Sequence, residues 1–164
     1  MRRHLLVTND FPPKVGGIQN YLWELWRRLE PSTTSVYCTP HRAAGPFDLD
    51  QPFTVRRARE PWLVPYPWLV GRIRRLAAAD DAQLVLLDPA LPLGLVGLFL
   101  GVPYGVILHG AEVTIPARLP VVRSIMARVL RGASVVVSAG DYALAEAQRC
   151  AGTALPGVVI PPGV

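Results

Sequence analysis

The chain has 164 residues, a length that suits one globular domain with a sizeable core. Apolar residues make up 51% of it, which excludes intrinsic disorder. The net charge is +5 and comes almost entirely from arginine, because Lys14 is the only lysine. Such a basic surface suits anionic partners such as phosphates, nucleic acid or acidic lipids, although an arginine-rich composition can equally reflect genomic base composition.

The cysteines and histidines are scattered along the chain and predict no metal site. Cys38 and Cys150 form no C-x-x-C pair, and the histidines form no H-E-x-x-H pattern. Two lone cysteines fit a reducing cytoplasm, and no signal peptide is apparent. Residues 89–108 approach the length of a membrane span, but prolines and glycines interrupt them, so we expect a buried helix followed by a buried strand. We therefore expect a cytoplasmic protein.

Hydrophobic periodicity predicts strands and helices that alternate along most of the chain. A helix is expected from about residue 18, with apolar side chains at i, i+3, i+4 and i+7, until Pro31 ends it. The other expected helices span residues 67–79, 91–100, 119–131 and 141–150. The expected strands span residues 4–8, 35–39, 53–57, 83–87, 104–108, 134–138 and 157–160.

The expected strands are apolar throughout, as strands covered on both faces are. Together with the alternation, this predicts an α/β fold: a Rossmann-like, three-layer domain with a mostly parallel sheet. The chain stops on a Pro-Pro-Gly turn just after the last strand, where a domain boundary is expected. We therefore expect residues 1–164 to form one domain.

The loop after the first strand carries Gly16-Gly17 directly before a helix. Ligands bind beyond the carboxyl ends of parallel strands, and a helix N-terminus offers unpaired N–H groups to a phosphate. A tight turn without a ligand would explain the two glycines equally well. The loop is not G-x-G-x-x-G, and Ala111-Glu112 replace the lysine and hydroxyl residue that a P-loop needs.

A second candidate loop carries His109 and Glu112 after another expected strand. At that position these side chains can orient hydroxyl groups or stabilise charge. The alternative is a histidine that is simply satisfied by hydrogen bonds in its loop. A G-x-S-x-G sequence is absent, so a serine hydrolase has no support.

Four segments of the sequence together resemble one known family. Residues 8–22 (T-N-D-F-P-P-K-V-G-G-I-Q-N-Y-L), 109–112 (H-G-A-E), 137–138 (V-S) and 159–164 (V-I-P-P-G-V) match, in order and spacing, elements of retaining GT-B glycosyltransferases of family 4. The likeness is strongest to the actinobacterial phosphatidylinositol mannosyltransferases. Two positions depart from the family: Ala111, where close relatives often have histidine, and Pro162, where asparagine is usual.

The resemblance implies an N-terminal, acceptor-side domain, one half of a GT-B fold whose C-terminal nucleotide-sugar-binding domain is absent from this chain. The implied reaction transfers a hexose, with mannose from GDP-mannose as the expected donor, to a lipid-linked or glycan acceptor with retention. Such enzymes need no metal and no cofactor beyond the donor. The chain alone is expected to be inactive.

The resemblance also implies roles for individual residues. Gly16 and Gly17 would approach the donor diphosphate, and His109 would be the catalytic residue beside the transferred sugar. The acceptor-binding residues would be Asp10, Gln19 and Glu112.

Residues 61–75 mix aromatic side chains with an arginine cluster, a composition typical of segments that lie on anionic membranes. The expected membrane contacts are Trp62, Trp68, Arg72, Arg74 and Arg75. An ordinary helix packed on the sheet, with solvated arginines, is the alternative. Lipid acceptors in the resembling family favour a peripheral position on the inner face of the plasma membrane.

Other classes of protein remain as alternatives. The runner-up is a stand-alone Rossmann-like module that binds a phosphorylated small molecule. A nicotinamide oxidoreductase lacks both the glycine fingerprint and an acidic residue placed to hold a ribose. Nucleic-acid binding is not expected, because the arginines form no single stripe and no known motif occurs.

Overall fold

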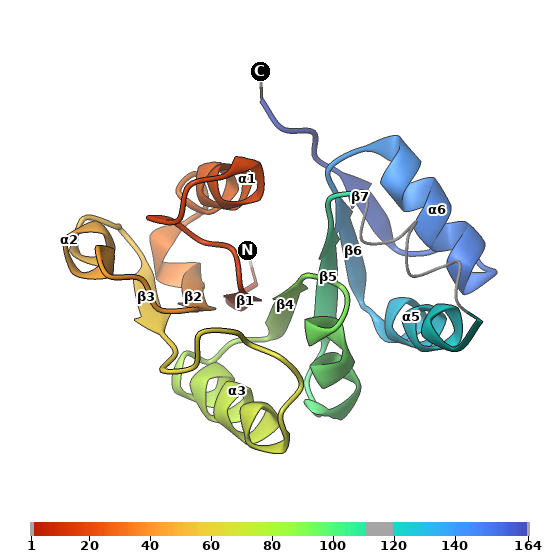
Figure 1. Ribbon diagram of the computed structural model, residues 1–164, viewed down its shortest axis with the longest axis horizontal. Coiled ribbons are helices and arrows are strands. Elements are labelled where there is room, and N and C mark those ends of the chain that lie inside the picture. The colour runs from red at the N-terminus through yellow and green to blue at the C-terminus, as the bar shows by residue number, and fades with distance from the viewer. Residues whose placement is uncertain (1, 111–119, 164) are drawn as a thin grey trace.

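The computed structural model describes residues 2–110 and 120–163. Strands and helices alternate along the chain, as the sequence predicts (Figure 1). The strands are β1 (His4–Thr8), β2 (Thr34–Cys38), β3 (Thr54–Arg57), β4 (Leu84–Asp88), β5 (Tyr104–Leu108), β6 (Val135–Ser138) and β7 (Gly157–Val159). The helices are α1 (Gly17–Trp26), α2 (Ala44–Leu49), α3 (Pro67–Ala79), α5 (Pro120–Gly132) and α6 (Asp141–Ala151), with 3₁₀ segments η1 (Pro31–Thr33) and η2 (Leu93–Phe99).

The strands form one seven-stranded sheet in the order β3-β2-β1-β4-β5-β6-β7. Every pairing in it is parallel, so the predicted fold class is confirmed. Strand order reverses direction between β1 and β4, the topological switch point where open α/β sheets bind their ligands. The register places Thr8, the last residue of β1, opposite Asp88, the last residue of β4.

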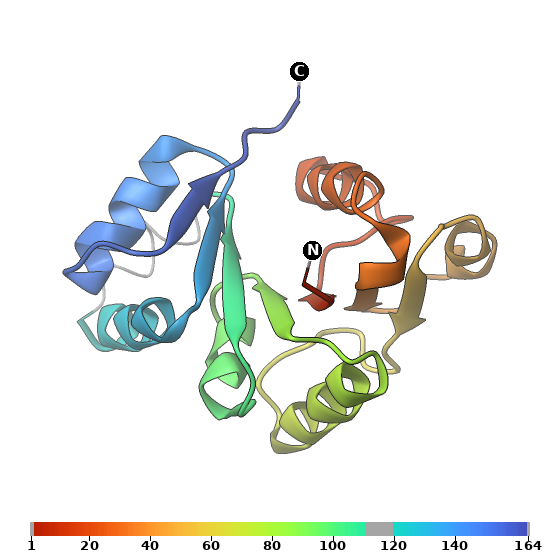
Figure 2. The same ribbon diagram turned by 180° about the vertical axis from the view of Figure 1, so that it is seen from behind.

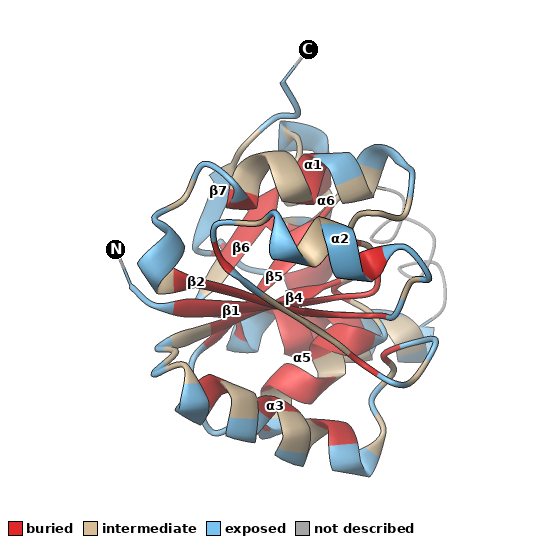
Figure 3. Ribbon diagram, turned by 90° about the vertical axis from the view of Figure 1, so that its left-hand side faces the viewer, coloured by how far each residue is buried: buried red, intermediate tan, exposed pale blue. Residues whose placement is uncertain are grey.

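Alternate side chains of each strand pack into different layers. Leu5 and Val7 join one core cluster, to which α3, η2, α5 and α6 contribute. Leu6 joins a second cluster with side chains of α1 and α2. Seen from either side, the sheet lies between α1 and α2 on one face and α3 on the other (Figures 1 and 2). Colouring by burial shows the central strands as the buried middle layer (Figure 3).

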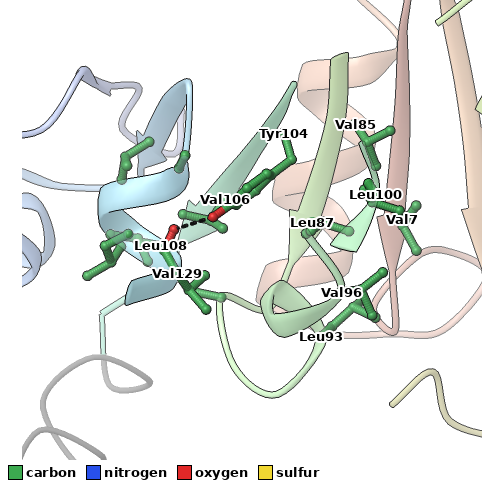
Figure 4. Close-up of a cluster of buried hydrophobic side chains, with 14 of the residues drawn as sticks. Val7, Val85, Leu87, Leu93, Val96, Leu100, Tyr104, Val106, Leu108 and Val129 are labelled. Carbon is green, nitrogen blue, oxygen red and sulfur yellow. Dashed lines mark hydrogen bonds between the residues drawn. The ribbon is translucent and has the colours of Figure 1, made fainter. Parts of the chain in front are cut away.

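The helix expected at residues 91–100 is a 3₁₀ segment, η2, which packs closely against β5. Gly97 lies so close to the Tyr104 ring that a Cβ atom there would be 2.5 Å from it. The Tyr104 hydroxyl donates a hydrogen bond to the Val129 carbonyl at 2.7 Å, which ties β5 to α5 (Figure 4). Tyr104 thus contacts both η2 and α5.

Two elements differ from expectation for local reasons. The helix α2 was not expected, because its six residues are too few to show helical periodicity. The strand β3 is exposed or half-buried along its length, because it pairs only with β2 at the edge of the sheet. It therefore carries polar side chains that a central strand would not tolerate. Within the described residues, no helix is long and apolar enough to cross a membrane.

Candidate functional site

The carboxyl ends of β1, β4 and β5 bring three polar side chains together. Thr8 and Asp88 end adjacent strands, and His109 follows β5 directly. The Asp88 carboxylate is 1% exposed. One of its oxygens accepts a hydrogen bond from the Thr8 hydroxyl at 2.6 Å, and the other lies 2.7 Å from Nε2 of His109. We name this Thr8–Asp88–His109 arrangement the buried triad.

The buried triad orients the imidazole of His109. An ionised carboxylate only accepts hydrogen bonds, so Nε2 carries the proton that faces Asp88. The Tyr21 ring meets the imidazole edge-on, with 5.6 Å between ring centroids and an interplanar angle of 86°. The imidazole is thus held by a charge on one side and by an aromatic ring on another, the kind of support that precise catalytic geometry needs.

Asp10 and Gln19 meet beside the buried triad. The Gln19 side-chain amide donates a hydrogen bond to Oδ1 of Asp10 at 2.7 Å. The backbone N–H of Asp10 donates to the Thr8 hydroxyl at 2.8 Å, which joins this pair to the triad. Burial raises the pKa of the Asp10 carboxyl, and the negative charge of Asp88 raises it further. A half-buried carboxylate next to an amide suits the binding of a sugar hydroxyl group.

Gly16 and Gly17 lie at the N-terminus of α1, where they have different surroundings. A Cβ atom on Gly16 would lie 2.2 Å from the Gln19 side-chain oxygen, whereas a Cβ atom on Gly17 would meet nothing within 4 Å. No side chain caps this helix end. Its first N–H groups therefore lack a capping partner from a side chain and can serve an anion.

A cavity of about 630 Å³ opens beside α1. It lies between the helix and the segment after β7, and Tyr21 closes one wall by donating a hydrogen bond to the Ile160 carbonyl at 2.7 Å. Its lining residues are Gly17, Asn20, Tyr21, Glu24, Leu25, Arg28, Pro161, Pro162 and Gly163. The cavity is large enough for a small organic molecule or part of one.

Asn9 and Lys14, which the sequence analysis did not single out, hold the loop between β1 and α1. The Asn9 side chain exchanges hydrogen bonds with the backbone of Leu63 at 2.9 and 2.7 Å. Lys14 Nζ donates to the Asn9 carbonyl at 2.9 Å and to the Thr39 hydroxyl at 2.6 Å. These bonds fix the path of the loop that carries Asp10.

The structure accounts for most, but not all, of the residues expected at this site. It brings together Asp10, Gly16, Gln19 and His109, and Gly17 lines the adjacent cavity. Glu112, like its neighbour Ala111, lies outside the described residues. Asp88 was missed, although an aspartate at the end of a buried apolar strand was a usable signal. Among the described residues, no cluster of three histidine, cysteine or acidic side chains could hold a metal ion.

The segment expected to contact a membrane presents its two tryptophans to solvent. Trp62 is 62% exposed and Trp68 is 56% exposed. Arg72, however, bonds to both oxygens of Glu60 at 2.8 and 2.9 Å. Arg74 bonds to the carbonyl of Leu100 at 2.8 Å and to that of Phe99. Of the three arginines expected to contact lipid, Arg75 alone has neither an acidic partner nor a bond outside its own helix in the described part of the chain.

Comparison with known proteins places the chain in a family. The sequence profile of Glycosyltransferase Family 4 matches residues 15–164. The GDP-mannose-dependent alpha-(1-6)-phosphatidylinositol monomannoside mannosyltransferase of Mycobacterium tuberculosis is 36% identical over 174 residues, covering 100% of this chain and 45% of the relative. The enzyme of the same name from Mycolicibacterium smegmatis is 33% identical, covering 98% of this chain and 44% of the relative. The chain therefore spans less than half the length of these relatives.

Solved structures share the fold at low sequence identity. Anabaena Alr3699/HepE in complex with UDP superposes with a TM-score of 0.70 at 17% identity, covering 100% of this chain and 44% of that protein. Glycyrrhiza uralensis UGT73P12 follows with a TM-score of 0.59 at 11% identity, covering 99% of this chain and 49% of that protein. The described domain thus has the Rossmann-like fold found in one half of GT-B enzymes. With the profile match and the mycobacterial relatives, this shows that the chain belongs to glycosyltransferase family 4.

Proposed function

We propose that the chain is the N-terminal, acceptor-side domain of a retaining mannosyltransferase that uses GDP-mannose and a lipid-linked or glycan acceptor. The observation that carries this proposal is the buried triad beside the uncapped N-terminus of α1, in a chain of this family. The names of the mycobacterial relatives support mannose, GDP and a phosphatidylinositol-type acceptor.

The residues of the site match the charges that sugar transfer creates. Breaking a sugar–phosphate bond leaves negative charge on the departing diphosphate, which N–H groups at a helix N-terminus stabilise. Gly16 and Gly17 let the diphosphate approach these groups. The sugar ring gains positive character, which the nearby carboxylate of Asp10 stabilises.

We propose His109 as the catalytic residue, because it directly follows β5 at the edge of the sheet where the transferred sugar would lie. Asp88 acts through it and is a positioning residue. Asp10 and Gln19 hold the acceptor hydroxyl by hydrogen bonds, with Glu112 as a further acceptor-binding residue. No metal ion and no cofactor besides the sugar donor take part in the proposed reaction.

A second domain that binds the nucleotide completes the proposed enzyme, because the relatives are more than twice as long as this chain. Residues 1–164 alone are then inactive. The runner-up function is a stand-alone module that binds a phosphorylated small molecule. The cavity beside the uncapped N-terminus of α1 favours this runner-up function. The cavity and the helix end both belong to the described domain, so a ligand could bind there without a second domain.

We further propose that the enzyme works in the cytoplasm, at the inner face of the plasma membrane, with Trp62 and Trp68 in the lipid interface. Indole rings prefer the headgroup level of a bilayer, and both rings are more than half exposed. Arg72, Arg74 and Arg75 lie on α3, directly after Trp68. A lipid acceptor would reach the site from this surface.

The test measures sugar transfer by the polypeptide that joins this chain to its second domain. GDP-mannose is offered with phosphatidylinositol-type acceptors, and UDP-glucose serves as the control donor. The His109→Ala variant is compared with His41→Ala, which makes the same change outside the site. Transfer from GDP-mannose that only His109→Ala abolishes would support the proposal. A folded protein that binds phosphorylated compounds but transfers from neither donor would instead identify the binding module.

A further inference from the structure

A second cavity of about 470 Å³ lies on the face of the sheet opposite α1. Its lining comes from α3 and from the carboxyl ends of β2 and β3. Because α3 and α1 lie on opposite faces of the sheet (Figure 1), the sheet separates this cavity from the buried triad and from Gly17. Five of its eight lining residues are arginines, and the lining consists of Tyr37, Arg56, Arg57, Ala58, Arg59, Arg72, Arg75 and Leu76. We name it the arginine pocket.

Three of these arginines are neutralised within the protein. Each forms an ion pair with two hydrogen bonds to one carboxylate, at distances between 2.6 and 3.1 Å. The pairs are Arg56 with Asp80, Arg57 with Asp48, and Arg72 with Glu60. These carboxylates are used up by their partners. The pairs of Arg56 and Arg72 fix two guanidinium groups that line the pocket, whereas the Arg57 guanidinium is directed to α2, where it pairs with Asp48.

Arg59 and Arg75 supply the excess charge. Neither has an acidic partner among the described residues, and the single bond of the Arg75 side chain goes back to the Gly71 carbonyl of its own helix at 3.4 Å. Arg59 follows the end of β3 and Arg75 lies on α3, so they stand on opposite walls. Two arginines without an acidic partner among the described residues therefore line the same cavity.

The walls of the arginine pocket are organised before any ligand arrives. Arg57 also donates to the carbonyls of Pro12 and Thr39, at 2.6 and 3.2 Å, which anchors the end of β3. Arg72 also donates to the Tyr37 hydroxyl at 3.2 Å, which leaves the Tyr37 O–H free to donate toward the pocket. Binding an anion would thus order only two exposed side chains, which keeps the entropic cost low.

We propose that the arginine pocket binds a phosphate group through Arg59 and Arg75, with Tyr37 as an additional donor. Guanidinium forks match phosphate oxygens two at a time, and two of them balance the two charges of a phosphate monoester. The cavity is much larger than a phosphate, so it can also admit the group that carries the phosphate. This site goes beyond the proposed transferase function and does not depend on it.

The phosphate can belong to a lipid headgroup or to a soluble compound, and the surroundings fit both. The exposed ring of Trp68 lies one turn before Arg72 on α3, which would place a lipid headgroup within reach. A soluble phosphate compound needs only the cavity itself. The experiment therefore has one arm for each source.

The first arm titrates the chain with pyrophosphate by isothermal calorimetry at constant ionic strength. The second measures co-sedimentation with phosphatidylcholine vesicles, with and without phosphatidic acid. Both arms compare Arg59→Ala/Arg75→Ala with Arg123→Ala/Arg128→Ala, which removes the same charge from exposed positions on α5. Thermal unfolding confirms that each variant is folded.

We expect the Arg59→Ala/Arg75→Ala variant to lose about tenfold or more in affinity, because two charge-assisted interactions disappear. The Arg123→Ala/Arg128→Ala variant should stay near the unsubstituted chain. Loss in the pyrophosphate arm assigns the pocket to a soluble phosphate, and loss confined to phosphatidic acid vesicles assigns it to a lipid. Equal losses in both variants, or no binding in either arm, would overturn the proposal.

Discussion

Asp88 occupies an unusual place for a charged side chain, because it is almost completely buried at the end of a central strand. Both of its carboxylate oxygens are in use, one by Thr8 and one by His109. A buried carboxylate is tolerated only when its oxygens are paired in this way. Burying this carboxylate costs free energy, and a need to orient His109 for the reaction would explain why it is buried there.

The substitution Asp88→Asn tests this positioning role. The amide has only one acceptor oxygen, so it cannot serve the Thr8 hydroxyl and the His109 Nε2–H as the carboxylate does. We expect His109 to lose its preference for the Nε2–H tautomer. The rate of sugar transfer should fall by roughly tenfold to a hundredfold. Ring ¹⁵N chemical shifts report the tautomer directly. If the tautomer is unchanged and the activity equals that of the exposed control Asp50→Asn, Asp88 does not position His109.

The raised pKa of Asp10 predicts how stability depends on pH. Burial and the charge of Asp88 raise this pKa in the folded protein above the ordinary value of an aspartate. The stability that Asp10 contributes is therefore fully present below that ordinary value, and is lost as pH rises through the folded pKa. A functional carboxylate that destabilises its own domain at neutral pH is common at active sites.

We expect Asp10→Asn to raise Tm at pH 7 more than it does at pH 3, because the variant has no carboxylate to ionise. Thermal unfolding of the chain at both pH values measures the difference. Asp50→Asn, at an exposed position, should show no such dependence. If the change in Tm is the same at both pH values, the environment of Asp10 does not disfavour its charge.

At the scale of elements, α1 joins the two parts of the site. Its first turn carries the glycine pair, and its side chains Gln19 and Tyr21 reach Asp10 and His109. The apolar periodicity that predicts this helix also points Leu22 and Trp26 into the core. Packing of one helical face therefore sets the position of its uncapped N-terminus.

The two glycines should respond differently to a methyl group. Gly17→Ala meets open space, so we expect a change in unfolding free energy within about 0.5 kcal/mol but weaker binding of GDP, where the methyl group faces the diphosphate. Gly16→Ala displaces Gln19 and breaks its bond to Asp10. Calorimetry with GDP on the two-domain polypeptide, together with urea unfolding, separates the effects. Unchanged GDP affinity in Gly17→Ala would contradict the diphosphate assignment.

At the scale of the whole molecule, the two faces of the sheet have separate tasks. The α1 face carries the proposed reaction, and the α3 face carries the arginine pocket, with the exposed Trp68 on α3 itself. Trp62 is held by Lys14, whose ammonium lies 5.5 Å from its ring centroid, and Trp68 stacks on Tyr66 at 4.7 Å. These contacts hold both rings at the surface, as membrane insertion would require.

Membrane contact predicts that Trp62→Ala/Trp68→Ala weakens binding to vesicles that contain phosphatidylglycerol. Each ring buries a large apolar area in the interface, so we expect a loss of about tenfold or more for the pair. Co-sedimentation measures it. Tyr142→Ala, an exposed aromatic position on α6, is the control and should bind normally. Equal binding by all three proteins would show that the tryptophans have another role.

Much of the fold could be predicted because its signals are local. Each strand of the structure lies within one or two residues of its expected range, since buried apolar runs mark central strands wherever they occur. The short helix α2 and the 3₁₀ form of η2 were beyond such reasoning. Six residues carry too little pattern, and the packing of Gly97 on Tyr104 depends on a neighbouring strand.

The sequence by itself determined the alternation of strands and helices, the glycine pair before α1 and the resemblance to a glycosyltransferase family. The tertiary structure decided which distant residues meet. Thr8 and Asp88 are 80 positions apart, and they meet because β4 pairs with β1 across the switch point. Arg59 and Arg75 line one pocket because α3 packs against the face of the sheet next to β2 and β3. Hydrophobic periodicity is a property of neighbouring residues, so it predicts elements but not the strand order that brings such side chains together.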